Sequence, residues 1–208
     1  MISNIRDIGN YDIAIVLYAS GSSGEFLAHA LSLCFKGFPK IDYSWQKNSR
    51  MKFKDCFGRS LNGADEPVAD STIIQRFNQY LEETRAGTND RLIGLSHPHL
   101  RSIEFIHSIL SKARVLEITT CHPDSQKFRN MAAAEKIGPK ERGTHLYKNT
   151  GHCFAKHLKI EWKDLFVSNT EQQFYYIENF LQQTGDFKIF THAVNDYLQR
   201  NQHLINEL

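Results

Sequence analysis

The stretch from Asp12 to Leu31 constrains the fold most, because it joins an apolar run to a helical pattern through a loop of small residues. Residues 13–18 are almost continuously apolar and rich in β-branched side chains, which is typical of a strand buried on both faces. From Phe26 to Cys34 apolar residues recur at helical spacing, and Ser22 or Ser23 is placed to cap that helix. This order predicts a buried strand, a tight loop and a helix.

The loop between strand and helix, Ser20-Gly21-Ser22-Ser23-Gly24, contains no bulky side chain. Backbone N–H groups at the N-terminus of a helix can therefore approach an anion directly. We predict that this loop binds phosphate. A tight turn without a ligand is the simpler alternative, since Glu25 stands where the phosphate loop of nucleotide triphosphatases has its lysine.

The rest of the chain alternates between strand and helix patterns. Further strands are predicted at 91–95, 114–119 and 154–162, and further helices at 70–85, 102–112, 124–137, 170–183 and 187–205. Gly87 and Gly185 are predicted to end the helices that precede them. Such alternation favours a three-layer α/β fold, with a parallel sheet of about four to five strands flanked by helices. We expect a single domain spanning residues 1–208.

Composition narrows the functional classes. A net charge of +2 implies no general affinity for nucleic acid. No segment approaches the roughly 20 apolar residues of a membrane span, and the N-terminus lacks an apolar signal core, so we expect a cytoplasmic protein. The cysteines form no C-x-x-C pair, and Cys121-His122 with His152-Cys153 matches no standard zinc spacing. We therefore expect no bound metal.

Histidine and cationic residues are expected at the edge of the sheet where the predicted strands end, which makes this edge a candidate ligand site. His97 and His99 follow the strand at 91–95, and ligands of open parallel sheets bind at the carboxyl ends of strands. Lys127 and Arg129 fall in the first turns of the helix at 124–137 and are candidate cations. Two basic segments, 36–63 and 138–152, are interpreted as an insertion beside the anion site and as a lid, with solvated surface loops as the alternative.

Several short motifs occur in one order. The loop contains Ser20-Gly21-Ser22-Ser23, the second strand ends in Leu95-Ser96-His97-Pro98, and Pro123 follows the third strand. Residues 158–165 then read L-K-I-E-W-K-D-L, and the next helix ends in Phe180-Leu181 before Gly185. In this order they resemble the sulfotransferase family, with its S-G-[ST]-[ST] loop, K-T-H segment, N-P-x-D turn, Y-E-D-L segment and F-L-G ending. The fold of that family is a parallel sheet of the P-loop NTPase type.

The resemblance implies transfer of a sulfuryl group from 3′-phosphoadenosine 5′-phosphosulfate to a hydroxyl or amine acceptor, without a metal. It implies that the loop at 20–24 binds the phosphosulfate and that His97 takes the proton of the acceptor. The family has a lysine or arginine at the position of Ala19 and an arginine near Cys121. Either positive charge comes from elsewhere, such as Lys36, Lys127, Arg129 or the lid at 138–152, or the donor pocket differs from that of the family. The sequence does not identify the acceptor, for which a glycan is one candidate.

Two other classes stay open. The first class is another nucleotide-binding enzyme. A dinucleotide enzyme would use Ala19-x-Gly21-x-x-Gly24, which is one glycine short of the dinucleotide fingerprint, and Asp42 is the only candidate for its ribose-binding acid. A kinase-like enzyme would lack the lysine of its phosphate loop. The second class is a non-catalytic module of the same fold that binds glycans or serves a structural role. Affinity for a nucleotide donor would separate this non-catalytic module from both kinds of enzyme.

Overall fold

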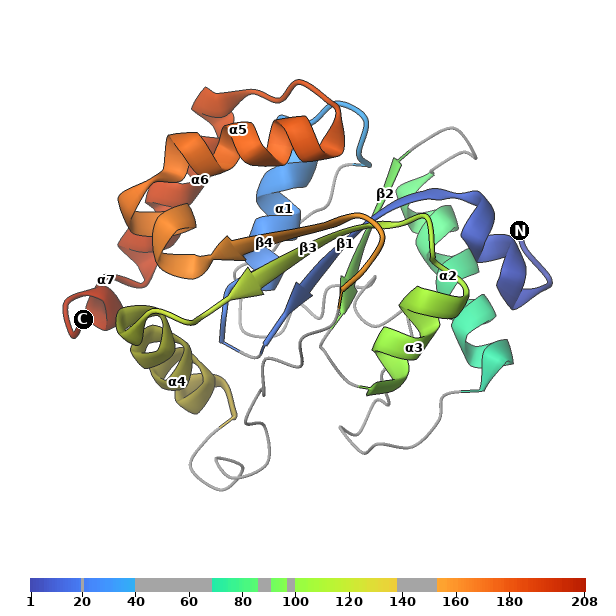
Figure 1. Ribbon diagram of the computed structural model, residues 1–208, viewed down its shortest axis with the longest axis horizontal. Coiled ribbons are helices and arrows are strands. Elements are labelled where there is room, and N and C mark those ends of the chain that lie inside the picture. The colour runs from blue at the N-terminus through green and yellow to red at the C-terminus, as the bar shows by residue number, and fades with distance from the viewer. Residues whose placement is uncertain (20, 40–68, 86–90, 97–99, 138–152) are drawn as a thin grey trace.

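The computed structural model describes residues 1–19, 21–39, 69–85, 91–96, 100–137 and 153–208 (Figure 1). Most of the basic segment at 36–63 and the whole of the predicted lid at 138–152 lie outside these residues, as do Ser20, His97 and His99. None of the helices in the described ranges combines the length and the apolar character that crossing a bilayer requires.

The described strands form one parallel sheet in the order β2-β1-β3-β4. Their bounds are β1 Asp12–Tyr18, β2 Arg91–Ser96, β3 Arg114–Thr119 and β4 His157–Glu161. Each lies where the sequence predicts a strand, and the predicted parallel sheet is confirmed. Strand β4 is shorter than predicted: it begins three residues later, at His157, and it ends one residue earlier because the chain turns into a helical conformation at Trp162.

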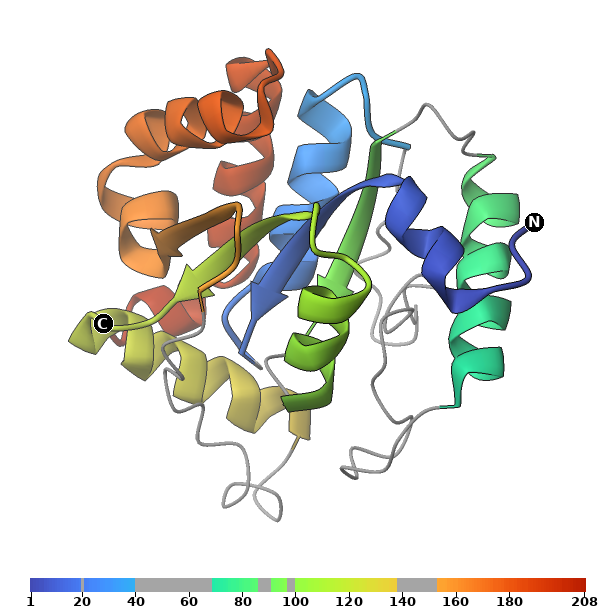
Figure 2. The ribbon, with the colours of Figure 1, turned by 45° about the vertical axis from the view of Figure 1, so that its right-hand side comes forward.

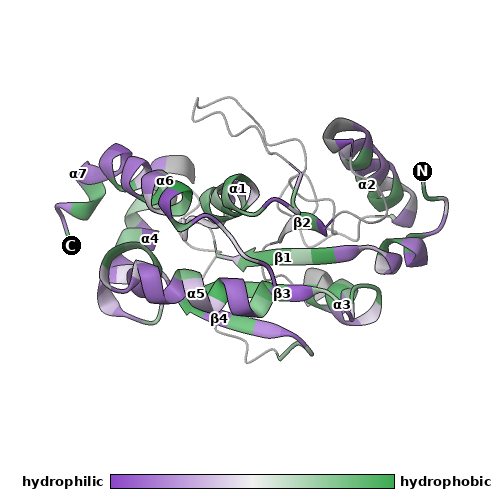
Figure 3. Cartoon of the chain, turned by 90° about the horizontal axis from the view of Figure 1, so that it is seen from above, coloured by the Kyte–Doolittle hydropathy of each residue, from purple (hydrophilic) through white to green (hydrophobic). Residues whose placement is uncertain are grey.

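Helices cover both faces of the sheet, which confirms the three-layer α/β fold. In Figures 1 and 2, α1, α5 and α6 lie above the sheet, whereas α3 and α4 lie below it. The helices are α1 Gly24–Cys34, α2 Asp70–Thr84, α3 Leu100–Ser108, α4 Pro123–Ile137, α5 Thr170–Leu181, α6 Phe187–Arg200 and α7 Gln202–Ile205, with a 3-10 helix η1 Ile5–Asn10 and a π-helix η3 Asp164–Ser168. Figure 3 shows hydrophobic residues on the strands and α1, and hydrophilic residues over much of α5 and α6.

Several helix ends differ from the predictions. Helix α3 stops at Ser108 rather than at Lys112, because Leu110 N bonds to Phe105 O at 3.4 Å and begins a turn into β3. Helix α5 ends at a left-handed residue, Gln182 with φ 54°, and not at Gly185. The long helix predicted at 187–205 is interrupted at Asn201, whose side-chain amide donates to Tyr197 O at 2.8 Å.

Strand β1 lies at the centre of the sheet, and the continuous apolar run that predicts it is explained by burial on both faces. Residues 13–17 are at most 1% exposed. At the amino end of the strand, the Asp12 carboxylate accepts from Arg91 Nε and from Arg114 Nη1, both at 2.7 Å. These ion pairs join the starts of β2 and β3 to β1 and help to set the parallel register.

The strand order places a topological switch point at β1. The chain passes from β1 to β2 on one side, then returns to β3 on the other side and continues outward to β4. In doubly wound sheets of this kind, ligands bind outside the carboxyl ends of the strands where the order reverses. The loop at residues 19–24 follows the carboxyl end of β1, and residues 120–122 follow the end of β3. A ligand site is therefore expected between these two loops.

Candidate functional site

The loop between β1 and α1 has a backbone conformation suited to an anion. Gly21 and Ser23 have φ angles of 84° and 67°, whereas Ser22 between them is not among the residues of positive φ. Alternation in the sign of φ can turn backbone N–H groups toward one concave side and form a nest for anions, but the Ser22 N–H is bonded within the turn and is not one of the groups that would face an anion here. Ser22 closes the turn, because its N–H and its hydroxyl both donate to Ala19 O, at 3.1 and 2.6 Å. Helix α1 begins at the next glycine, Gly24.

Each glycine of the loop is required by a close neighbour as well as by its place in the loop. A Cβ atom at Gly21 would lie 2.3 Å from Arg129 O and 3.0 Å from Ala133 N, so the backbone of α4 packs directly on the loop. Figure 2 shows α4 just beyond the arrowheads of β1 and β3. A Cβ atom at Gly24 would lie 2.0 Å from Tyr18 Cγ. The absence of bulky side chains therefore serves packing, whether or not an anion is bound.

Ser23 occupies the N-cap position of α1, as predicted, but the predicted side-chain cap is absent. Its hydroxyl is engaged in long-range contacts instead: it accepts from Trp162 Nε1 at 3.1 Å and forms a short hydrogen bond with Tyr197 Oη. The left-handed backbone of Ser23 explains why the local cap fails, since N-cap residues normally have extended dihedral angles.

The two partners of the Ser23 hydroxyl, Trp162 and Tyr197, belong to a buried aromatic cluster. Phe26 stacks on Tyr197 with ring centroids 4.3 Å apart, and Phe128 stacks on Trp162 at 4.2 Å. Phe166 contacts members of both pairs. The cluster joins α1, α4, η3 and α6, so the loop rests on a packed apolar base. The sequence analysis did not identify Trp162 and Tyr197 as neighbours of the loop, because the pattern around each of them indicates only that the side chain is buried.

The N-terminus of α4 is occupied by the carboxylate of Glu161. This carboxylate accepts from Cys121 N at 2.8 Å, His122 N at 3.3 Å and Thr119 Oγ1 at 3.0 Å. An anion would therefore be repelled from this helix end, although helix N-termini are otherwise favourable for anions. Helix α4 also begins one residue earlier than predicted, at Pro123, a residue whose missing N–H is tolerated there.

Beside this helix end, Asp124 forms an ion pair with Lys163. The distance from Lys163 Nζ to Asp124 Oδ2 is 2.7 Å, and the same amine lies 3.4 Å from His122 Nε2. The hydrogen bond from Lys163 holds the pKa of the Asp124 carboxyl below its ordinary value of 3.8. The predicted capping role of Asp124 or Ser125 is not observed, since Ser125 Oγ accepts instead from Lys163 N at 3.2 Å.

The predicted cations have different surroundings. Arg129 donates from Nη1 to Thr120 Oγ1 at 3.0 Å, at the end of β3, and its backbone carbonyl lies against Gly21. Lys127 donates to the backbone carbonyl of Glu207 near the C-terminus. The structure thus places the Arg129 backbone against the loop and its guanidinium at the end of β3, while the Lys127 amine is engaged just beyond α7. The proposed base His97 and the first loop residue Ser20 lie outside the described residues.

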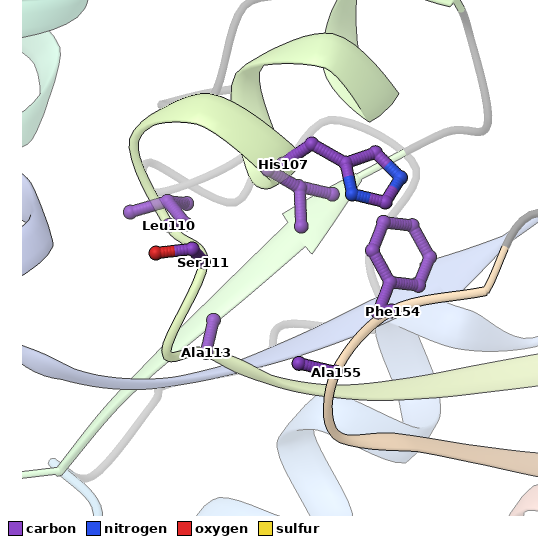
Figure 4. A pocket seen from close by; sticks show the side chains of 7 residues that line it. His107, Leu110, Ser111, Ala113, Phe154 and Ala155 are labelled. Carbon is purple, nitrogen blue, oxygen red and sulfur yellow. The ribbon is translucent and has the colours of Figure 1, made fainter.

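A small pocket lies at the opposite edge of the sheet, near the amino ends of β3 and β4 (Figure 4). Its volume is about 70 Å³, and it is lined by Ile106, His107, Leu110, Ser111, Ala113, Phe154 and Ala155. The His107 ring stacks on Phe154 at 4.8 Å. Ligand pockets for nucleotide-sized molecules have volumes of roughly 300–1,000 Å³, so this pocket is not a nucleotide site.

Within the described ranges, no group of three or more histidine, cysteine, aspartate or glutamate side chains is placed to hold a metal ion. A comparison with models of known protein families finds no match, and no curated protein is significantly similar in sequence. The candidate site therefore rests on its own geometry: a loop of alternating backbone handedness at the switch point of the sheet, with Arg129 beside it.

Proposed function

We propose that this protein binds the phosphate groups of a nucleotide at the loop of residues 20–24. The observation that carries the proposal is the alternation of positive and non-positive φ angles from Gly21 to Ser23, immediately before α1. The position of the loop at the switch point of the sheet supports it. The resemblance to sulfotransferases implies that the nucleotide is 3′-phosphoadenosine 5′-phosphosulfate and that the reaction is sulfuryl transfer.

In this proposal the protein acts through position and charge. The backbone N–H groups of the loop hold the phosphosulfate, and the Arg129 guanidinium balances part of its charge from the end of β3. His97 accepts the proton of the acceptor hydroxyl or amine, for which an ordinary histidine pKa of about 6.5 is suitable. Transfer of this kind needs in-line alignment and stabilisation of spread negative charge, as in phosphoryl transfer. The acceptor is unidentified, a glycan being one candidate.

A second candidate function is binding without catalysis, which the charges around the loop favour. Ala19 stands where the family has a cation, and the Lys127 amine is engaged with the Glu207 carbonyl. Glu25 adds a carboxylate to the first turn of α1. A module that binds a glycan or another protein would need no cation at these positions. Kinase-like or dinucleotide-dependent enzymes would bind ATP or NAD at the same loop.

Calorimetric titration with 3′-phosphoadenosine 5′-phosphate, with ATP and NAD in parallel, tests these candidates. We expect micromolar binding of the bisphosphate and at least tenfold weaker binding of ATP and NAD. Preference for ATP or NAD would favour the other nucleotide enzymes. Absence of all binding by folded protein would refute the proposed function and favour the non-catalytic module.

A charge placed in the loop tests the location of the site. Ser23→Asp adds a carboxylate to the phosphate-binding loop; at about 5 Å and an effective dielectric constant of about 20, each pair of like charges costs roughly 3 kcal/mol. We expect binding to weaken more than 100-fold. Ser168→Asp, at an exposed serine of η3, is the matched control and should bind like the unaltered protein. Equal affinity in the two variants would place the nucleotide elsewhere.

A further inference from the structure

The hydroxyl of Ser23 connects the candidate loop to two elements distant in the chain. Trp162, which follows β4, donates its indole N–H to Ser23 Oγ at 3.1 Å, and Tyr197 of α6 contacts the same oxygen through its own hydroxyl. Trp162 is fully buried and Tyr197 is 7% exposed, whereas Ser23 is partly exposed. Two buried side chains therefore hold Ser23, a residue that solvent and ligands can reach.

The hydrogen-bonding capacity of the three groups limits how they can be arranged. An indole N–H only donates, so Ser23 Oγ must accept from Trp162. A serine hydroxyl has two lone pairs and one proton. If Tyr197 donates into the second lone pair, the proton of Ser23 is left to donate to a third group. An anion in the loop would select this arrangement, because it can only accept.

The backbone of Ser23 needs the same support. Its φ of 67° is left-handed, a conformation that costs an L-residue roughly 1–2 kcal/mol and persists where surrounding structure enforces it. The side-chain contacts of Ser23 are those of its hydroxyl with Trp162 and Tyr197, and its carbonyl accepts from Leu27 N at 3.0 Å. Ser23 is also the residue that completes the alternation in the sign of φ on which the proposed anion binding depends.

We propose that Tyr197 and Trp162 are positioning residues for the phosphate-binding loop. They hold Ser23 in its left-handed conformation and direct its hydroxyl proton toward the bound phosphate. This inference rests on the proposed function. It adds Ser23 as a side-chain donor, and it makes α6 part of the binding site although the helix itself contacts no ligand.

Removal of the tyrosine hydroxyl tests the proposal. In Tyr197→Phe the ring can keep its stacking on Phe26, at a centroid distance of 4.3 Å. Affinity for 3′-phosphoadenosine 5′-phosphate is expected to fall about tenfold, because the Ser23 hydroxyl that donates to the charged phosphate is no longer held in place. Tyr176→Phe is the matched control: its hydroxyl accepts from Gln172 Nε2 at 2.8 Å on the exposed surface of α5, and its removal should leave affinity unchanged.

A double-mutant cycle distinguishes positioning from a general structural role. Ser23→Ala is expected to weaken binding about tenfold by itself, and Tyr197→Phe should then cause little further loss, because both variants remove one shared network. Independent losses in the double variant would overturn the proposal, as would unchanged affinity in Ser23→Ala alone, even if Tyr197→Phe failed to fold. Failure of the unaltered protein to bind would instead refute the proposed function.

Discussion

Replacement of Gly21 by alanine is expected to destabilise the whole fold, because this residue lies where the loop meets α4. Its φ is 84°, and an added Cβ would lie 2.3 Å from Arg129 O, 3.0 Å from Ala133 N and 3.2 Å from Ala133 Cβ. The nearest of these atoms belong to backbone, so no side-chain rotation can relieve the overlap. Either the loop or α4 must move.

The magnitude follows from two contributions. The left-handed conformation costs alanine about 1–2 kcal/mol relative to glycine. Overpacking against neighbours that cannot rotate away costs roughly 1–3 kcal/mol. We therefore expect Gly21→Ala to lower the free energy of unfolding by about 2–5 kcal/mol, a large part of the roughly 5–15 kcal/mol typical of a native protein.

Urea denaturation followed by circular dichroism measures this loss, with Gly37→Ala as the control. A Cβ at Gly37 would lie 2.5 Å from Gln183 Nε2, the far end of a flexible side chain, and no positive φ is involved. The control should cost less than about 1 kcal/mol. Equal losses in the two variants would refute the tight contact between the loop and α4.

Two further predictions concern hydrogen-bonded and charged pairs. Glu117 and His157 lie 2.8 Å apart with side chains 5% and 9% exposed, so Glu117→Ala leaves a buried imidazole without this partner and should cost about 1–3 kcal/mol in urea denaturation. Glu135→Ala breaks the 2.9 Å contact with His203, at 53% and 59% exposure, and should cost about 0–1 kcal/mol. Similar costs in the two variants would contradict the role of burial. Because Lys163 lowers the pKa of Asp124, that pair stabilises the fold above pH 3.8 and loses its effect as the pH falls through the depressed pKa. Lys163→Met should raise the pKa of Asp124 toward 3.8, which an NMR titration of the carboxyl group measures; an unchanged pKa would rule out Lys163 as the cause.

The fold was predictable where local pattern and tertiary environment agree. Strands β1, β2 and β3 lie within one residue of their predicted bounds, and their strong apolar patterns reflect burial in the sheet. Helix α1 follows from its spacing of apolar residues for the same reason. The parallel order followed from the alternation of strand and helix, because parallel neighbours need a crossover connection that is long enough to hold a helix.

Helix ends were less predictable because neighbouring elements determine them. Gln182 takes the left-handed conformation that a glycine was expected to provide at Gly185. The break at Asn201 separates α6 from α7, although residues 187–208 contain no glycine or proline. In each case the residue type permits several conformations, and packing selects one.

The sequence by itself determined the fold class and the position of a small-residue loop after the central strand, because periodicity and side-chain size are local properties. Only the tertiary structure decided what that loop contacts. The partners of Ser23 lie 139 and 174 residues away, and the backbone that packs on Gly21 belongs to a helix beyond the third strand. Such contacts depend on how the helices dock against the sheet, and no spacing along the chain encodes them.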